Sequence, residues 1–264
     1  MELSWLAYAA IFGIGLVTGA INTLAGSGSF ITLPILIFFG FDPTLANGTN
    51  RVGVLSQSAI GAYSLQKFAN LDLKHALWLL VPSVIGGIIG AQIAVDINKE
   101  AMNTAIGVLM VMMLGVVLLK PRQWLREKTE AMGQHKSPLL LGIFFLIGIY
   151  GGFIQAGVGV FMLIALVTVG KYTINHSNTI KLIVTLALTV PALAIFAYSG
   201  EVHWQVGIIL AISQSAGAVG AARFAALYPG ANQWVRRLLI IILIAVIIRF
   251  FELHELLLHF VEGT

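Results

Sequence analysis

"NTLAGSGSFITLP", residues 22–34, interrupts the first apolar block of the chain. Weak helix formers crowd this stretch, at Asn22, Thr23, Gly26, Ser27, Gly28 and Ser29. In a lipid bilayer every backbone amide needs a partner inside the protein, because no water is present to replace one. The stretch therefore predicts that one helix ends and another begins here, with free amides that bond to the protein or to a ligand.

The composition places the chain in a membrane. Of its 264 residues, 58% are hydrophobic and only 10% are charged, whereas soluble domains are about 25% charged. The mean hydropathy is +0.94, which is typical of an all-α polytopic membrane protein whose main partner is the lipid bilayer. The pI near 9.4 fits basic cytoplasmic loops, so no nucleic-acid partner is expected. Glu2 stands where a signal peptide is basic, which favours a retained first span.

Apolar blocks along the chain predict about ten membrane spans. Two blocks, 28–41 and 158–170, are short and cover only roughly 20 Å as helices, against a hydrocarbon core of about 30 Å. They either cross with help from neighbouring loops or are re-entrant. The other blocks are 3–22, 45–66, 75–95, 101–119, 139–155, 174–198, 204–227 and 235–251.

The charges favour crossing by both short blocks. Ten spans put Glu2, Asp42, Asp96, Lys99, Glu100, Glu201 and the acidic tail on one side, opposite Lys67, Lys74, the linker cations, Lys171, Arg236 and Arg237. Basic loops stay on the cytoplasmic side of a membrane. This topology predicts a multi-pass protein of the inner (plasma) membrane with both termini on the outer, periplasmic side. Re-entrant short blocks would move Arg236 and Arg237 away from the other cations.

Three motifs recur in order at nearly constant separation. "AGSGSF" at 25–30 matches "AGVGVF" at 156–161, 131 residues later; "TNR" at 49–51 and "GGIIGA" at 86–91 match "TIK" at 179–181 and "AGAVGA" at 216–221, each 130 residues later. Five spans per copy is an odd number, so the second copy enters from the other face. The pattern predicts two five-span inverted repeats with short broken helices near the midplane, an architecture common in transporters. Chance similarity between Gly- and Ala-rich helices is the alternative.

These matches divide the chain into four predicted regions. The division is 1–119 for the first transmembrane repeat, 120–138 for a basic cytoplasmic linker, 139–251 for the second transmembrane repeat and 252–264 for an acidic outer C-terminal tail.

The broken stretches predict an anion site. The amides of residues 26–29 would lie at the N-terminus of a short helix, where partial positive charge favours an anion. "FIQAGVGVF" at 153–161 repeats the pattern and contributes Gln155 and Gly157. The alternative is that the glycines only allow close packing between helices.

Two cations within the spans support the prediction of an anion site. All eleven acidic residues map to loops, span ends or tails, whereas Arg51 and Lys181 lie within apolar blocks at equivalent positions of the two copies. A cation in a span is costly and is a functional candidate by default, and without an acid nearby its natural counter-ion is a bound anion. The alternative is that both side chains snorkel to the headgroups. Neighbouring residues that can hydrogen-bond to oxygens are Asn47, Thr49, Asn50, Asn178 and Thr179.

Other chemistries find little support in the sequence. The six histidines are scattered without the spacing of metal ligands, so we expect no metal site and no cofactor. No nucleophile–base pair is recognisable, and we therefore expect a protein that is not an enzyme.

The motifs "GAINTLAGSGSFITLPIL…ANGTNRVG" and "GGFIQAGVGVF…NHSNTIK" resemble the TauE/SafE sulfite-exporter family over essentially the whole chain. This resemblance implies an inner-membrane carrier of small sulfur oxyanions and organosulfonates. It implies a site that includes Asn22, Ser27, Ser29, Asn50, Arg51, Asn178 and Lys181. The second copy departs from the first, because Val158 and Val160 replace the two serine hydroxyls.

The combined prediction is a secondary transporter that moves a small sulfur-containing anion such as sulfite or an organosulfonate by alternating access, with export as the direction that the family resemblance implies and the sequence itself leaves open. An anion channel or a non-catalytic membrane accessory subunit are the alternatives. The sequence leaves open the coupling ion and whether two copies form a homodimer.

Overall fold

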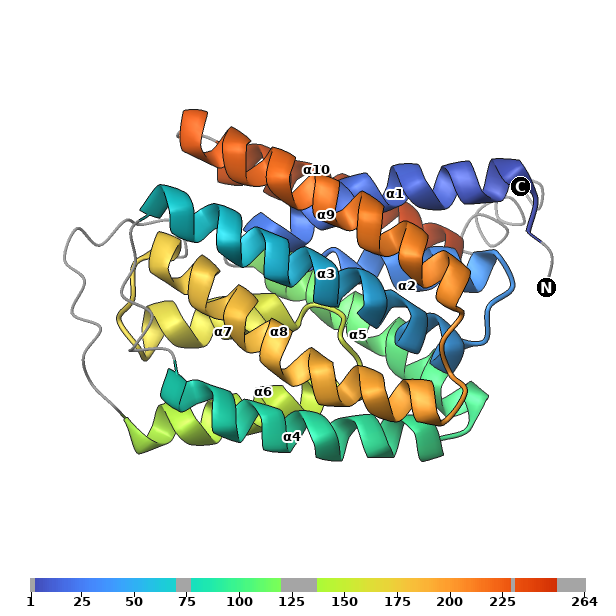
Figure 1. Ribbon diagram of the computed structural model, residues 1–264, viewed down its shortest axis with the longest axis horizontal. Helices are drawn as coiled ribbons and strands as arrows, with labels where there is room; N and C mark the ends of the chain where they lie inside the picture. Colours follow the sequence, from blue (N-terminus) through green and yellow to red (C-terminus); the bar gives the residue numbers. More distant parts are fainter. Residues whose placement is uncertain (1–2, 70–76, 120–136, 229–230, 251–264) are drawn as a thin grey trace, which may run out of the picture.

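The computed structural model describes residues 3–69, 77–119, 137–228 and 231–250, and these residues form helices without a strand among them (Figure 1). The expected all-α class is therefore confirmed. The helices are α1 (Trp5–Leu24), α2 (Ser29–Phe38), α3 (Pro43–Ala69), α4 (Leu77–Asp96), α5 (Lys99–Leu119), α6 (Pro138–Phe153), α7 (Val158–Thr168), α8 (Ile174–Tyr198), α9 (Trp204–Leu227) and α10 (Ala231–Phe250).

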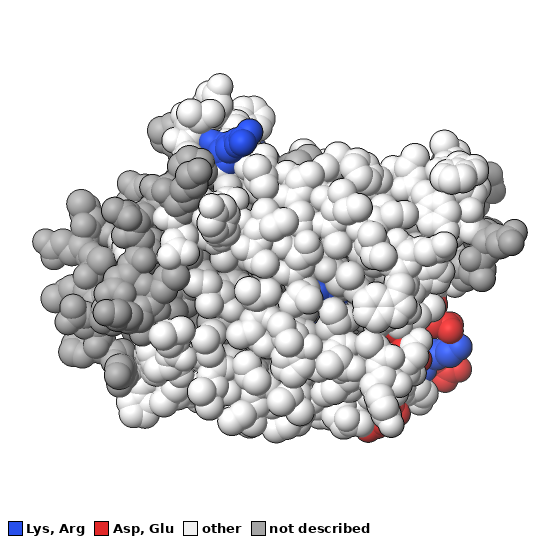
Figure 2. Space-filling model, in the orientation of Figure 1, with Lys and Arg blue, Asp and Glu red and all other residues white. Residues whose placement is uncertain are grey.

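The helices have the length and surface of membrane spans. Four of them, α1, α4, α9 and the His176–Tyr198 part of α8, are long and apolar enough to cross a bilayer, and α2, α6 and α7 are shorter apolar helices. Exposed apolar side chains such as Leu77, Val81 and Ile85 line the outer face of α4. Figure 2 shows a face almost free of charged side chains, apart from groups near its edges and one small basic patch near its middle. These features fit a multi-pass membrane protein, while the number of spans stays a prediction.

Glycine contacts join α1 to α9 and α6 to α4. When the chain is divided into α1–α5 and α6–α10, these contacts join the first helix of each half to the fourth helix of the other half. α4 and α6 lie side by side in Figure 1, and a Cβ on Gly90 of α4 would lie 1.9 Å from the carbonyl oxygen of Ile149 in α6. In the same way, α1 packs on α9, where a Cβ on Gly19 would lie 2.0 Å from the carbonyl oxygen of Gln214. Small residues allow this approach because lipid provides no hydrophobic force between helices.

The predicted helix breaks are present in both halves. α1 ends at Leu24, and α2 begins at Ser29 after Gly26, whose φ is +75°. The segment between α6 and α7 contains Gly157, 131 residues further along the chain, with a φ of +71°. Glycine suits both positions because a Cβ disfavours positive φ. The breaks also touch each other, since a Cβ on Gly26 would lie 2.6 Å from the backbone of Gly159.

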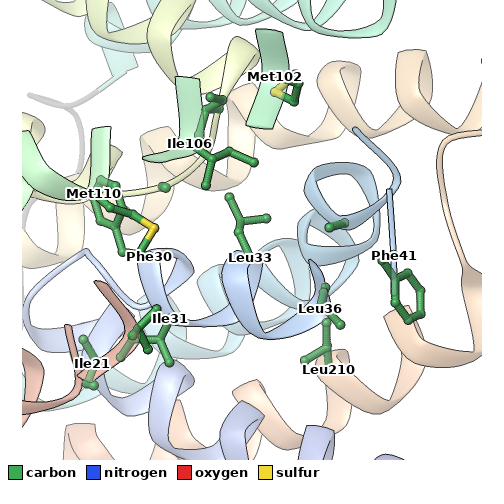
Figure 3. Packing of buried hydrophobic residues seen from close by; sticks show 14 of the residues in the cluster. Ile21, Phe30, Ile31, Leu33, Leu36, Phe41, Met102, Ile106, Met110 and Leu210 are labelled. Carbon is green, nitrogen blue, oxygen red and sulfur yellow. The ribbon is translucent and has the colours of Figure 1, made fainter. Parts of the chain in front are cut away.

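α2 lies inside the helix bundle. Most of its apolar side chains are buried, although Phe38 at its C-terminal end is 45% exposed. It packs against α1, α3, α5 and α10, and Figure 3 shows its buried residues. A short helix that is apolar on every side is stable only in such an interior. The labelled residues of this core are Ile21, Phe30, Ile31, Leu33, Leu36, Phe41, Met102, Ile106, Met110 and Leu210.

Charged residues from three connections meet at one end of the bundle. Asp42, before α3, forms an ion pair of 2.6 Å with Lys99 at the start of α5, and this hydrogen bond raises the pKa of the Lys99 ammonium. Burial raises the pKa of the nearby Glu201 carboxyl, and Asp42 raises it further. The sequence-based topology assigns these connections to one side of the membrane, and the Asp42–Lys99 pair agrees with that assignment.

The break at Gly26 yields a test of the fold. We expect Gly26→Ala to lower the unfolding temperature of the detergent-purified protein, because alanine at positive φ costs about 1–3 kcal/mol and its Cβ also meets Gly159. Gly13→Ala is the matched control, since a Cβ on Gly13 meets nothing within 4 Å. Equal unfolding temperatures for the two variants would contradict the described geometry.

Candidate functional site

Lys181 of α8 caps the end of α1. Its Nζ donates to the carbonyl oxygens of Asn22 at 3.0 Å and Thr23 at 2.8 Å, and to Oδ1 of Asn178 at 3.0 Å. The side chain is 1% exposed. The last carbonyls of a helix have no partner within the helix and form the negative end of its dipole. A buried ammonium therefore satisfies the broken end of α1.

Arg51 of α3 caps the end of α6 in a similar way. Its Nη1 donates to the carbonyl oxygen of Gly151 and to Oε1 of Gln155, both at 3.1 Å, and its Nη2 donates to the carbonyl oxygen of Gly152. The guanidinium carbon lies 4.4 Å from the centre of the Phe196 ring, a cation–π contact. Arg51 has no exposed surface, so it is held in the interior and does not snorkel outward.

The two caps are reciprocal. A cation from the first half binds the broken helix of the second half, and a cation from the second half binds the broken helix of the first. Sequence reasoning selected Arg51 and Lys181 as buried cations but did not anticipate carbonyl partners. The partners are invisible in sequence because they lie 100 and more residues away.

A small cavity lies between the two breaks. Its volume is about 20 Å³, room for about one water molecule. No acidic residue lines it within the described part of the chain. Its lining residues are Asn22, Gly26, Ser29, Val54, Gln155, Val158, Gly159, Lys181, Leu182 and Thr185.

Five predicted site residues thus line one cavity: Asn22, Gly26, Ser29, Gln155 and Lys181. Four other predicted site residues form hydrogen bonds with lining residues. Gly28 donates its N–H to Oδ1 of Asn22, Asn50 donates to Oγ of Ser29, Asn178 accepts from Lys181, and Arg51 donates to Gln155.

The remaining predicted residues lie further from the cavity lining. Asn47 donates to the carbonyl oxygen of Phe153 at 2.7 Å and so supports the end of α6 together with Arg51. Thr49 accepts from the N–H of His203 at the start of α9. Ser27 is buried with a hydroxyl that has no partner among the described residues, Gly157 packs against the Phe30 ring, and Thr179 is buried.

The sequence did not predict five other residues that line the cavity. Val54, Val158, Gly159, Leu182 and Thr185 line it, and none was selected as a site residue. A helical signal was available for one of them, because Thr185 follows Lys181 by four residues and hence lies on the same face of α8.

The described residues contain no cluster of possible metal ligands. No three His, Cys, Asp or Glu side chains come together anywhere in those ranges. The arrangement instead combines buried hydrogen-bond donors, helix ends and a small cavity. In a membrane protein, broken helices of this kind around a buried polar cavity define the class of transporters.

Comparison with known proteins identifies the family. The family model described as Sulfite exporter TauE/SafE matches residues 11–250, so the chain belongs to this family. It is 27% identical to "Probable membrane transporter protein ORF9" of Sinorhizobium sp over 252 residues, covering 94% of each chain. It is 26% identical to a "Probable membrane transporter protein" of Haemophilus influenzae, over 80% of this chain and 82% of that one.

A third relative is more distant. "Probable membrane transporter protein YfcA" of Escherichia coli K12 is 22% identical, over 82% of this chain and 80% of that protein. No solved structure matches the chain. These relationships identify a membrane transporter.

The caps generate a stability prediction. We expect Arg51→Gln to lower the unfolding temperature strongly, because breaking a buried charged hydrogen-bond network costs about 3–5 kcal/mol and leaves the α6 carbonyls unpaired. Arg223→Gln is the matched control on α9, where the side chain is exposed, and we expect it to unfold close to wild type. The measurement is thermal unfolding in detergent, and equal stability of both variants would exclude the capping role.

Proposed function

We propose that this transporter is a secondary carrier that exports small sulfur-containing anions, such as sulfite or organosulfonates, across the inner membrane by alternating access. The observation that carries the proposal is the cavity between the two helix breaks, which gathers hydrogen-bond donors and a buried ammonium without an acidic residue. Such a cavity attracts anions and gives a cation no carboxylate ligand.

Two helix N-termini strengthen the attraction. α2 begins at Ser29 and α7 at Val158, and residues of both first turns line the cavity. The N-terminus of a helix carries partial positive charge and free N–H groups. At the same time, Arg51 and Lys181 cover the opposite, negative helix ends, so the electrostatics around the cavity favour an anion.

Several observations support the proposed inverted repeats of five spans each. Positive φ occurs at Gly26 and Gly157, and again at Gly40 and Lys171, each pair 131 residues apart. The exchange of caps between the halves and the matched α1–α9 and α4–α6 contacts are what a two-fold relation between repeats would produce. We propose ten spans, with the termini on the periplasmic side and the boundaries of the sequence analysis. Residues 120–136 of the predicted linker 120–138 and the whole predicted tail 252–264 lie outside the described residues.

The small cavity volume fits a state of an alternating-access cycle that does not hold the substrate. Space for about one water molecule does not admit a sulfonate, so the walls have to separate before the anion binds. One wall comes from α1, α2 and α3 and the other from α7, α8 and the segment before α7. Motion of one half against the other would open the cavity alternately to each side.

The test is uptake of radiolabelled sulfite into proteoliposomes that contain the purified protein. We expect saturable uptake that excess unlabelled sulfite inhibits. Lys181→Gln should lower the initial rate at least tenfold, because it removes the buried charge beside the cavity and uncaps α1.

Lys99→Gln, which alters an exposed ammonium at the bundle end, is the control, and we expect it to transport like wild type. The absence of saturable uptake of any sulfur anion would overturn the proposal. Single-channel currents far above carrier turnover would instead establish an anion channel.

A further inference from the structure

We propose that the cavity selects oxyanions that carry no hydroxyl hydrogen, such as a sulfonate group, and that Asn22 and Gln155 determine this selectivity. The inference rests on the proposed function, since it concerns how the same cavity distinguishes between anions. Its basis is the direction of the hydrogen bonds around the cavity.

The orientation of the Asn22 amide is set by its partner. The backbone N–H of Gly28 lies 2.7 Å from Oδ1 of Asn22, and an N–H only donates, so the oxygen of the amide faces Gly28. The NH₂ group therefore faces the other way. Nδ2 of Asn22 is buried and has no hydrogen-bond partner among the described residues, and Asn22 lines the cavity. Its two donor hydrogens are covered in this state and become available to a ligand when the walls of the cavity separate.

The orientation of the Gln155 amide is likewise set by its hydrogen-bond partners. Its Oε1 accepts from Nη1 of Arg51 at 3.1 Å, and a guanidinium has donors only. Its Nε2 donates one hydrogen to Oγ1 of Thr189, which leaves the second hydrogen without a partner among the described residues. Gln155 also lines the cavity. Arg51 thus acts as a positioning residue that turns a donor of the second half toward the anion.

Ser29 adds further donors. Its Oγ accepts from Nδ2 of Asn50 at 3.0 Å, and Asn50 in turn accepts from Gln214, so the hydroxyl hydrogen of Ser29 is left to donate to a ligand. The backbone N–H of Ser29, in the first turn of α2, has no acceptor among the described residues. By contrast, Lys181 supplies charge without a free hydrogen, because all three of its donors are used.

Carboxylates are absent from the described cavity lining. The side-chain oxygens of Asn22 and Gln155 each already accept one hydrogen bond, which leaves each a single further lone pair. The Thr185 hydroxyl donates to Sδ of Met162 at 3.7 Å and keeps only the weak acceptor capacity of a neutral hydroxyl. A ligand hydroxyl would therefore compete for these partly used oxygens, and in any other direction its hydrogen would face donors or apolar side chains and lose the hydrogen bond it has in water.

This arrangement survives opening of the cavity. The bond from Gly28 to Asn22 closes within one short segment of the chain, so the Asn22 NH₂ group keeps its direction when the two walls separate. The contribution of Asn22 is therefore a property of the α1–α2 break, whereas that of Gln155 depends on its contact with Arg51.

The test compares two ligands of almost equal size, methanesulfonate and methylphosphonate, at a pH where the latter is a monoanion with one hydroxyl. Binding is measured by the ligand-induced rise in unfolding temperature of the full-length protein and by inhibition of sulfite uptake. We expect methanesulfonate to bind at least about 100-fold more tightly, because polar groups left unpaired discriminate by large factors. This comparison uses the wild-type protein and needs no variant.

Asn22→Asp then tests the residue. The carboxylate still accepts from Gly28 but replaces the two donor hydrogens with an acceptor, so methanesulfonate should bind more weakly and the ratio between the ligands should fall at least tenfold. Asn98→Asp, the same change at an exposed position before α5, is the control and should keep both affinities.

The outcomes separate this inference from the proposed function. Equal binding of both ligands to the wild-type protein overturns the selectivity but leaves an anion transporter. Binding of neither ligand, without any sulfite uptake, overturns both proposals. An unchanged ratio in Asn22→Asp overturns the assignment to Asn22.

Discussion

The architecture depends on the reciprocal capping of two broken helices, in which a basic side chain from each half binds the helix end of the other half. A helix that stops inside a membrane leaves carbonyls without partners, and an isolated ammonium or guanidinium at that depth is equally costly. Lys181 on the end of α1 and Arg51 on the end of α6 offset both costs at once. Since each cap comes from the other half, neither broken helix is complete without the opposite half.

The caps also create the asymmetry of charge that an anion site needs. At each break, one helix ends and the next begins, so negative and positive dipole ends lie close together and would largely cancel. Covering the negative ends with buried cations leaves the N-termini of α2 and α7 as the dominant partial charges. The amides of Asn22 and Gln155, oriented by donor-only partners, add donors that need no further rearrangement.

The two halves share this plan but do not contribute equally. The first half lines the cavity with Asn22 and Ser29, whereas the second presents Val158 at the position that corresponds to Ser27. The resulting cavity is asymmetric and combines polar donors with the apolar side chains of Val54, Val158 and Leu182. An anion with an apolar substituent matches such a surface better than a symmetric inorganic ion, which accords with organosulfonates as substrates of the proposed carrier.

Composition and local pattern determined the helical membrane class, both helix breaks and the two buried cations. Breaks at Gly26 and Gly157 are local events, because glycine and weak helix formers act within one turn. Five cavity-lining residues were predicted for the same reason. The tertiary structure alone decided what the cations bind, which way the amides of Asn22 and Gln155 face, and that Val54, Leu182 and Thr185 complete the wall. These depend on contacts between distant segments, and the sequence carries no local signal for a hydrogen bond across 100 residues.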